Sequence, residues 1–265
     1  MGTVVSLDVR HAEPKAAAAA MDRAFAVLHA ADERFSPFRP DSELSRLDRG
    51  ELTDDEVSDD MREVLSIAER ARVDSGGVFD VRTPEGRLDT NGVVKGWAAQ
   101  RAADGLVAAG VVDFLLNAGG DVVARGEAGP GQPWQVAVRH PNDPMAVLVT
   151  LEVRDGAVAT SGTYERGAHV WDGRTGSRDV PFVAATVVAA DLTVADVLAT
   201  TVLAMGEEGP AWAMAHGATA VLALPVEDDE DATAPVEGDG DPTAQAPEAA
   251  TPAVRTETDS VSGAR

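Results

Sequence analysis

Residues 87–121 hold the side chains whose types and spacing best suit chemistry. Asp89, Asn91 and Gly92 belong to a short polar turn, and Lys95 stands where a helix is expected to begin. A helix N-terminus attracts phosphate, a glycine there lets a ligand approach the backbone closely, and a lysine adds positive charge. A carboxylate beside such a site more often serves a metal or a sugar hydroxyl than the phosphate. The stretch therefore indicates a phosphate-bearing ligand and is compatible with an accompanying divalent cation.

The same stretch also has a plainer interpretation. Its spacing matches neither the phosphate-binding GxxxxGK[ST] loop nor the GxGxxG dinucleotide motif. An ordinary loop–helix–strand unit would bury one helix face, end the helix at Gly110 and continue into a strand at 111–116. Taken alone, the stretch does not decide between a ligand site and such a unit.

The elements that must position these residues follow from the apolar periodicity. Strands are predicted at 3–9, 111–116, 134–139, 148–153, 157–161, 183–189 and 219–224, with a short strand or turn at 78–81. Helices are predicted at 15–33, 43–47, 59–72, 193–205 and 209–216, in addition to the central helix that ends at Gly110. Capping signals precede two of these helices, at 41–42 and at 58–59. Hairpin-like strand pairs around 134–161 favour an α+β fold with mixed or antiparallel sheets and packed helices.

The composition changes after the last predicted strand. Residues 226–265 carry 11 acidic and 2 basic residues and show no apolar periodicity. Such a segment buries too little apolar surface to order itself. We therefore predict one folded domain over residues 1–224 and an acidic, disordered tail over residues 225–265.

Composition also excludes several classes of function. The 265-residue chain has a formal net charge of −23, which disfavours binding to nucleic acid or to an anionic membrane. The absence of cysteine rules out disulfides, thiolate catalysis and cysteine-based metal sites. No apolar run reaches the roughly 18 residues that a transmembrane helix needs, so no integral membrane segment is expected. Without a visible signal peptide the chain is predicted to be cytoplasmic, or exported or membrane-associated if an N-terminal segment is missing.

A series of motifs, met in order along residues 1–224, resembles the ApbE family of FAD:protein FMN transferases. The motifs are MGT, FSPFRPDSELSRLD, GGVFDV, LDTNGVVKGWAAQRAADGL, LLNAGGDVVARG, VATSGTYER, HVWDGRTG and ADVLATTVLAMG. The resemblance implies a flavin transferase domain that binds FAD and Mg²⁺ in a cleft. It also implies transfer of the FMN half of FAD to a threonine of a target flavoprotein, with release of AMP. The acceptor threonine is expected in an Asp-x-x-Thr-Gly-Ala-Thr-like motif.

The resemblance also implies roles for single residues. The positions that match FAD contacts in the family are Met1, Phe38, Val78, Phe79, Asp80, Asp89, Lys95 and Val170. Those that match metal ligands are Gly92, through its backbone oxygen, Asp196 and Thr200. Asp196 and Thr200 are four residues apart and would share one helix face, and their hard oxygens suit Mg²⁺. Lys95 would compensate phosphate charge, and His169 would accept the proton of the attacking hydroxyl.

Some features depart from the family or leave alternatives open. Gly173 stands where family members commonly have proline, and the acidic tail is not part of the family pattern. Asp80 has a turn or cap role as its alternative, and His169 that of a buried, hydrogen-bonded histidine. With the whole chain considered, residues 119–121 are interpreted as a structural turn near the site. The alternative functions are a Mg²⁺-dependent FAD pyrophosphatase, which gives FMN and AMP, and a non-enzymatic FAD-binding carrier.

Overall fold

The computed structural model describes residues 3–10, 12–166, 169–226 and 254–256 of the chain. Its helices are α1 (Pro14–Phe35), α2 (Glu43–Asp48), α3 (Asp59–Asp74), α4 (Asn91–Ala108), α5 (Thr163–Arg166), α6 (Leu192–Met205), the short 3-10 helix η1 (Gly206–Glu208) and α7 (Gly209–Ala215). Its strands are β1 (Val5–Arg10), β2 (Asp113–Ala118), β3 (Asp121–Arg125), β4 (Trp134–His140), β5 (Asp143–Val153), β6 (Gly156–Gly162), β7 (Phe182–Ala189), β8 (Ala218–Pro225) and β9 (Val254–Thr256).

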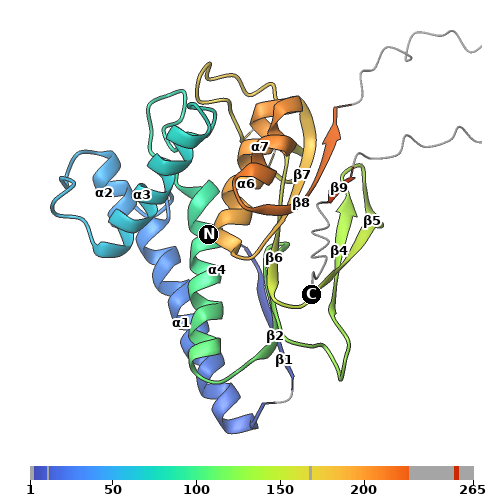
Figure 1. Cartoon of the computed structure of the whole chain (residues 1–265). Coiled ribbons are helices and arrows are strands. Elements are labelled where there is room, and N and C mark those ends of the chain that lie inside the picture. Colours follow the sequence, from blue (N-terminus) through green and yellow to red (C-terminus); the bar gives the residue numbers. More distant parts are fainter. Residues whose placement is uncertain (1–2, 11, 167–168, 227–253, 257–265) are drawn as a thin grey trace, which may run out of the picture.

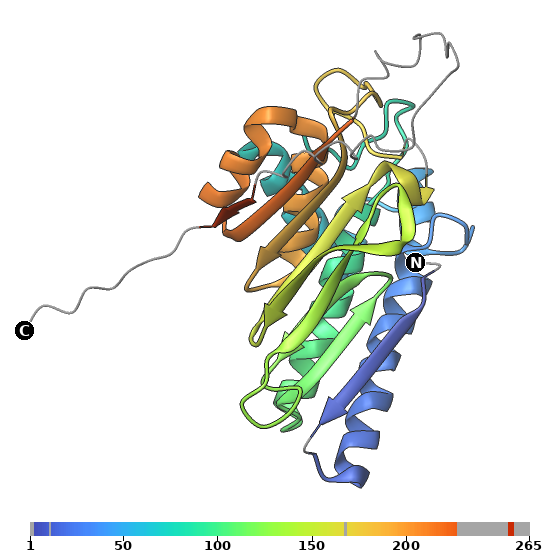
Figure 2. The same cartoon turned by 90° about the vertical axis from the view of Figure 1, so that its right-hand side faces the viewer.

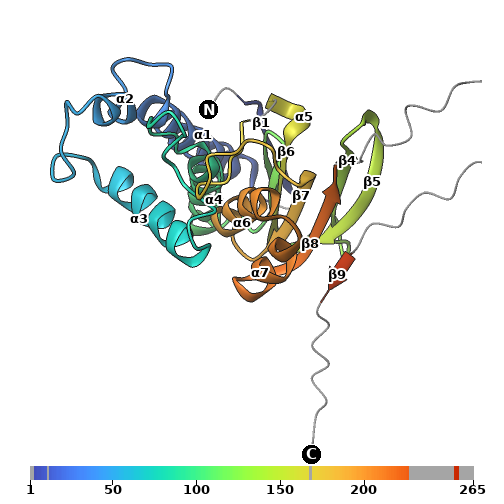
Figure 3. The same ribbon diagram turned by 90° about the horizontal axis from the view of Figure 1, so that it is seen from above.

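One large antiparallel sheet organises the fold. Its strand order is β1-β2-β3-β6-β7-β8-β9, and β4 and β5 form a separate two-stranded sheet. The helices α1, α4 and α6 cover one face of the large sheet (Figures 1 and 3). The β4–β5 hairpin packs on the other face through a small cluster that includes Val122, Trp134 and Val158 (Figure 2). The predicted α+β class is therefore confirmed, and all pairings between the described strands are antiparallel.

Helix α4 is the central element of the helical layer. Its buried residues include Val94, Trp97, Ala98, Ala102 and Leu106. The helix packs between α1 and α6, as Figure 1 shows. After it, Gly110 adopts a φ of 81°, which a glycine tolerates without strain and which ends the helix as predicted.

Most element boundaries agree with the sequence patterns, although β5 begins at Asp143 and not at residue 148, and several differences fall near the site. Helix α4 begins at Asn91, so Asn91 and Gly92 form its first turn and not the polar turn before it. Residues 119–120 do form a turn, but Asp121 is the first residue of an additional strand, β3, which pairs with β2 and β6. Helix α5, at Thr163–Arg166, was not predicted either. Segment 78–81 contains no regular strand, in line with the turn alternative.

The C-terminal segment adds one short strand to the edge of the large sheet. Within the predicted tail, Val254–Thr256 form β9, which pairs with β8, whereas residues 227–253 and 257–265 lie outside the described residues. For those three residues the prediction of disorder differs from the structure, because the open edge of β8 offers them backbone partners.

No helix in the described part of the chain is long and apolar enough to cross a membrane.

Candidate functional site

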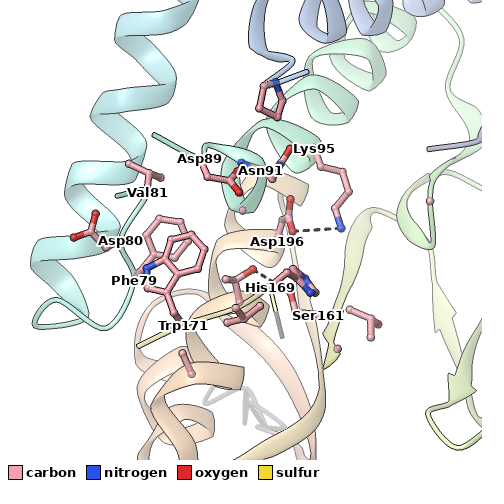
Figure 4. Close-up of a pocket in the computed structure, with 18 of the residues that line it drawn as sticks. Phe79, Asp80, Val81, Asp89, Asn91, Lys95, Ser161, His169, Trp171 and Asp196 are labelled. Atoms are coloured by element: carbon pink, nitrogen blue, oxygen red, sulfur yellow. Dashed lines mark hydrogen bonds and ion pairs between the residues drawn. The ribbon is translucent and has the colours of Figure 1, made fainter. Parts of the chain in front are cut away.

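The predicted site residues converge on one cavity of about 290 Å³. Those that line it are Phe38, Val78, Phe79, Asp80, Asp89, Gly92, Lys95, His169, Val170, Asp196 and Thr200. Figure 4 shows how side chains from distant parts of the sequence point into the same space. Met1, the remaining predicted FAD contact, lies outside the described residues.

A close crossing of α4 and α6 builds the inner end of the cavity. The backbone N–H of Gly96 donates to Asp196 Oδ2 over 2.8 Å, although the two residues are 100 positions apart. A Cβ at position 96 would lie 2.6 Å from the carbonyl oxygen of Leu192 and 2.7 Å from Asp196 Cβ. Gly96 is therefore required where the two helices cross. Its small size admits α6 rather than a ligand, and the crossing brings Asp196 beside Lys95.

Lys95 lies between two buried carboxylates. Its Nζ is 2.5 Å from Asp121 Oδ2 and 3.6 Å from Asp196 Oδ1. Asp121 is 1% exposed and Asp196 2% exposed. Burial raises the pKa of Asp196 to about 7, an effect that the Lys95 ammonium opposes and the Asp121 carboxylate reinforces. One ammonium facing two carboxylates leaves this end of the cavity short of positive charge, which favours a cation.

Hard oxygen atoms gather around the same point. Asp196 and Thr200 lie one turn apart on α6, and Ser161 Oγ is 3.0 Å from Thr200 Oγ1. Gly92, in the first turn of α4, faces Thr200, since a Cβ there would lie 3.6 Å from Thr200 Cγ2. Gly92 and Gly96 are four residues apart in α4, so the Gly92 carbonyl lies on the same side of the helix as the Gly96 N–H that donates to Asp196.

These oxygen atoms supply only part of a coordination shell for Mg²⁺. The described residues contain no cluster of three or more His, Cys, Asp or Glu side chains suited to a metal. Mg²⁺ commonly uses one or two carboxylates and completes its shell with substrate phosphates and waters. The residues present therefore suit a partial magnesium site that needs a phosphate-bearing ligand to be complete.

The outer part of the cavity has an apolar wall. Val78 and Phe79 are buried, whereas Phe38 at the rim is 92% exposed. The Gly173 N–H donates to the Val78 carbonyl over 2.8 Å. A Cβ on Gly173 would lie 2.5 Å from the Gly77 carbonyl oxygen, so the part of the α5–β7 loop around Gly173 packs directly on this wall.

The two acidic residues of this wall also serve local structure. Asp80 Oδ1 accepts from the Arg82 N–H over 2.7 Å, and Asp89 Oδ1 accepts from the Asn91 N–H over 2.9 Å. These are Asx-type turns, which fix the loop before α4. The turn role considered for Asp80 is thus present, and it leaves a second carboxylate oxygen in each residue.

Comparison with known proteins now bears on these observations. The family model described as the ApbE family matches residues 1–85 and 81–223. The chain belongs to the ApbE family. This confirms the resemblance that the sequence motifs indicate.

Named relatives agree with the family assignment. The FAD:protein FMN transferase of Vibrio cholerae is 31% identical over 166 residues, 59% of this chain and 49% of the relative. That of Rhodobacter capsulatus is 36% identical over 151 residues, 53% of this chain and 28% of the relative. The chain thus spans about half or less of the length of these two curated relatives.

Solved structures confirm the fold. The flavin transferase ApbE from Vibrio cholerae matches with a TM-score of 0.72 at 26% identity, covering 86% of this chain and 92% of that one. The apbe protein from Thermotoga maritima matches with a TM-score of 0.71 at 21% identity, covering 84% and 91%, which shows the fold alone. The large antiparallel sheet with its helical layer is therefore an ApbE-type fold.

Sequence reasoning missed two polar residues that contact the predicted site residues. Asp121 was assigned to a structural turn, yet its carboxylate contacts Lys95. Ser161 was seen only as part of a motif, yet its hydroxyl contacts Thr200. A usable signal existed for Asp121, because it is an acidic residue at the start of an otherwise apolar segment. For Ser161 the alternation of β6 gives no signal that distinguishes its side chain.

The predicted proton acceptor lies in the same cavity. His169 is half-buried and lines the same cavity as Ser161 and Asp196, and Figure 4 labels all three. It follows residues 167–168, which lie outside the described residues. The structure thus brings His169 together with the predicted phosphate and metal residues, and its catalytic role stays a prediction.

Proposed function

We propose that this chain is a Mg²⁺-dependent FAD:protein FMN transferase. It would break the pyrophosphate bond of FAD, join the FMN phosphate to a threonine hydroxyl of a target flavoprotein, and release AMP. The observation that carries this proposal is the meeting of Lys95, Asp196 and Thr200 at the inner end of a cavity with an apolar outer wall. The names of the curated relatives support the same activity.

The inner end would hold the metal and the phosphates. Asp196, Thr200 and the Gly92 carbonyl would supply oxygen ligands to Mg²⁺. When bound, the ion would neutralise pyrophosphate charge and stabilise the departing AMP phosphate. Lys95 Nζ, held close by, would bind a non-bridging phosphate oxygen through a charge-assisted hydrogen bond.

The outer wall would hold the flavin. Val78, Phe79 and Val170 present buried apolar surface, and the exposed ring of Phe38 offers a stacking face at the rim. The second carboxylate oxygens of Asp80 and Asp89 remain available for polar groups of FAD. This wall would orient the dinucleotide so that its pyrophosphate reaches Lys95.

The transfer step needs a proton acceptor. The acceptor hydroxyl oxygen would form a new bond to the FMN phosphorus as the bond from that phosphorus to the AMP oxygen breaks. The hydroxyl proton would pass to a ring nitrogen of His169, which lines the cavity. The released AMP carries away the electron pair of the broken bond, so the reaction needs no other reactant.

One assay tests this function directly. The full chain is mixed with FAD, Mg²⁺ and an acceptor that carries an Asp-x-x-Thr-Gly-Ala-Thr motif. We expect in-gel flavin fluorescence that survives denaturation, and none with the matched acceptor in which both threonines of the motif are alanine. Free FMN and AMP without a covalent band would identify a pyrophosphatase instead. Bound but intact FAD would identify a carrier.

A further inference from the structure

The position of Asp121 is not explained by packing alone. Asp121 opens β3, where it is almost fully buried, and its Oδ1 accepts from the Thr160 N–H over 3.0 Å. Its Oδ2 lies 2.5 Å from Lys95 Nζ. A buried carboxylate is costly unless it is paired and hydrogen-bonded, so its place beside Lys95 calls for a reason.

We propose that Asp121 is a positioning residue that holds the Lys95 ammonium away from Asp196 and so keeps the Asp196 carboxylate available to Mg²⁺. The inference rests on the proposed function, since it concerns the metal and phosphate end of the same cavity. Asp121 itself touches neither substrate nor metal in this account. It acts through Lys95.

The distances carry the argument. Lys95 Nζ is in direct contact with Asp121 but 3.6 Å from Asp196 Oδ1, beyond a charge-assisted hydrogen bond. The other Asp196 oxygen, Oδ2, already accepts from the Gly96 N–H. Oδ1 is therefore the oxygen for which a lysine and a metal would compete. A shift of Nζ by about 1 Å would shorten the Lys95–Asp196 ion pair to a charge-assisted hydrogen bond, because such bonds are about 2.7–2.9 Å long.

The scaffold keeps Asp121 fixed while the lysine can move. Asp121 is held on β3 between β2 and β6, and Thr160 on β6 supplies its hydrogen bond. The next residue of β6, Ser161, contacts Thr200. Lys95 by contrast has a long, flexible side chain. Removing the charge of Asp121 should thus relocate the ammonium and leave the strand in place.

A direct electrostatic effect is the competing explanation. The Asp121 charge could attract a divalent cation by itself, without any action through Lys95. The two explanations differ in what happens when Lys95 is also removed. If Asp121 acts through the lysine, the loss caused by Asp121→Asn disappears in a Lys95→Met background. If it acts directly, the loss stays.

The test uses Mn²⁺ as the probe. Full-length, FAD-loaded protein without acceptor is titrated with Mn²⁺, and free Mn²⁺ is measured by electron paramagnetic resonance. We expect Asp121→Asn to raise the dissociation constant for Mn²⁺ about tenfold, because a modest Lys95–Asp196 ion pair would then compete with the metal. We expect the double variant Lys95→Met/Asp121→Asn to bind Mn²⁺ as Lys95→Met does. If Asp121→Asn does not fold, Asp121→Ser, which keeps a small polar side chain near Thr160, takes its place.

Three results of the Mn²⁺ titration would overturn the proposed role of Asp121. Unchanged Mn²⁺ affinity in a folded Asp121 variant overturns the inference and leaves the proposed function standing. A loss that persists in the double variant also overturns it, in favour of the direct effect. A wild-type protein that binds FAD but no Mn²⁺ overturns the proposed metal site, and the inference falls with it.

Discussion

Replacement of Gly96 by alanine tests the close crossing of α4 and α6. The added Cβ would lie 2.6 Å from the Leu192 carbonyl oxygen and 2.7 Å from Asp196 Cβ, so the helices must separate. Overpacking of a core costs about 1–3 kcal/mol, and losing the hydrogen bond to the Asp196 carboxylate adds about 1.5–3 kcal/mol. The higher helix propensity of alanine returns about 1 kcal/mol. We expect a net loss of roughly 1.5–5 kcal/mol in the free energy of unfolding.

The same helix offers a matched control. Gly105 is exposed, lies in α4 as well, and a Cβ there would meet no atom within 4 Å. Gly105→Ala should therefore raise the free energy of unfolding by up to about 1 kcal/mol. Both variants are measured by urea unfolding of the metal-free protein. If Gly96→Ala stabilised the protein as Gly105→Ala does, the account of the crossing would be refuted.

Three further changes test other parts of the site. Thr200→Val should lower Mg²⁺ affinity about 10–100-fold in a metal titration, the effect expected when an oxygen that supports the metal site is lost. Thr201→Val is the control and should leave the affinity unchanged, because the Thr201 hydroxyl donates to the Val197 carbonyl within the helix. Because burial raises the pKa of Asp196 to about 7, the metal-free folded state holds a proton that the unfolded chain releases above about pH 4. The free energy of unfolding should thus fall as pH rises from about 4 to about 7, with a smaller slope in Asp196→Asn; equal slopes would contradict the assignment. Gly173→Pro should weaken FAD binding in a fluorescence titration, because proline cannot donate to the Val78 carbonyl; unaltered binding would mean that this loop does not support the wall.

Local rules predicted those parts of the fold that depend on neighbouring residues. Ser42 and Ser58 accept hydrogen bonds from backbone N–H groups at the starts of α2 and α3, as their capping patterns indicate. Gly110 ends α4 with a positive φ. Such features need only a few consecutive residues, so the sequence contains all the information that they require.

Parts that depend on distant partners were harder to predict. Strand β3 is short and covered on both faces, by the helical layer on the side of Val123 and by the β4–β5 hairpin on the side of Val122, so its residues lack the alternation that a half-exposed strand shows. Asp121 was assigned to a turn because it follows Gly119 and Gly120, and its contact with Lys95 depends on a helix that is distant in sequence. The start of α4 was placed late, since Thr90 provides no side-chain cap to mark it.

The candidate site combines both situations. The family resemblance selected Lys95, Asp196 and Thr200, and all three line one cavity. Spacing alone placed Asp196 and Thr200 on one helix face but could not place that face beside α4. The contact between α4 and α6 depends on Gly96, and this role of Gly96 becomes apparent only once the position of α6 is known.

The hydrogen bond from Gly96 to Asp196 has a consequence for synthesis of the chain. It joins residues 100 positions apart, so α4 leaves the ribosome long before its partner helix exists. Contacts of such large sequence separation form late in folding, because closing the chain between the two residues costs conformational entropy before the contact stabilises the fold. Until then, the side of α4 that later packs on α6 has no cover from that helix. A nascent chain that stops before residue 192 should therefore be prone to aggregation and unable to retain flavin.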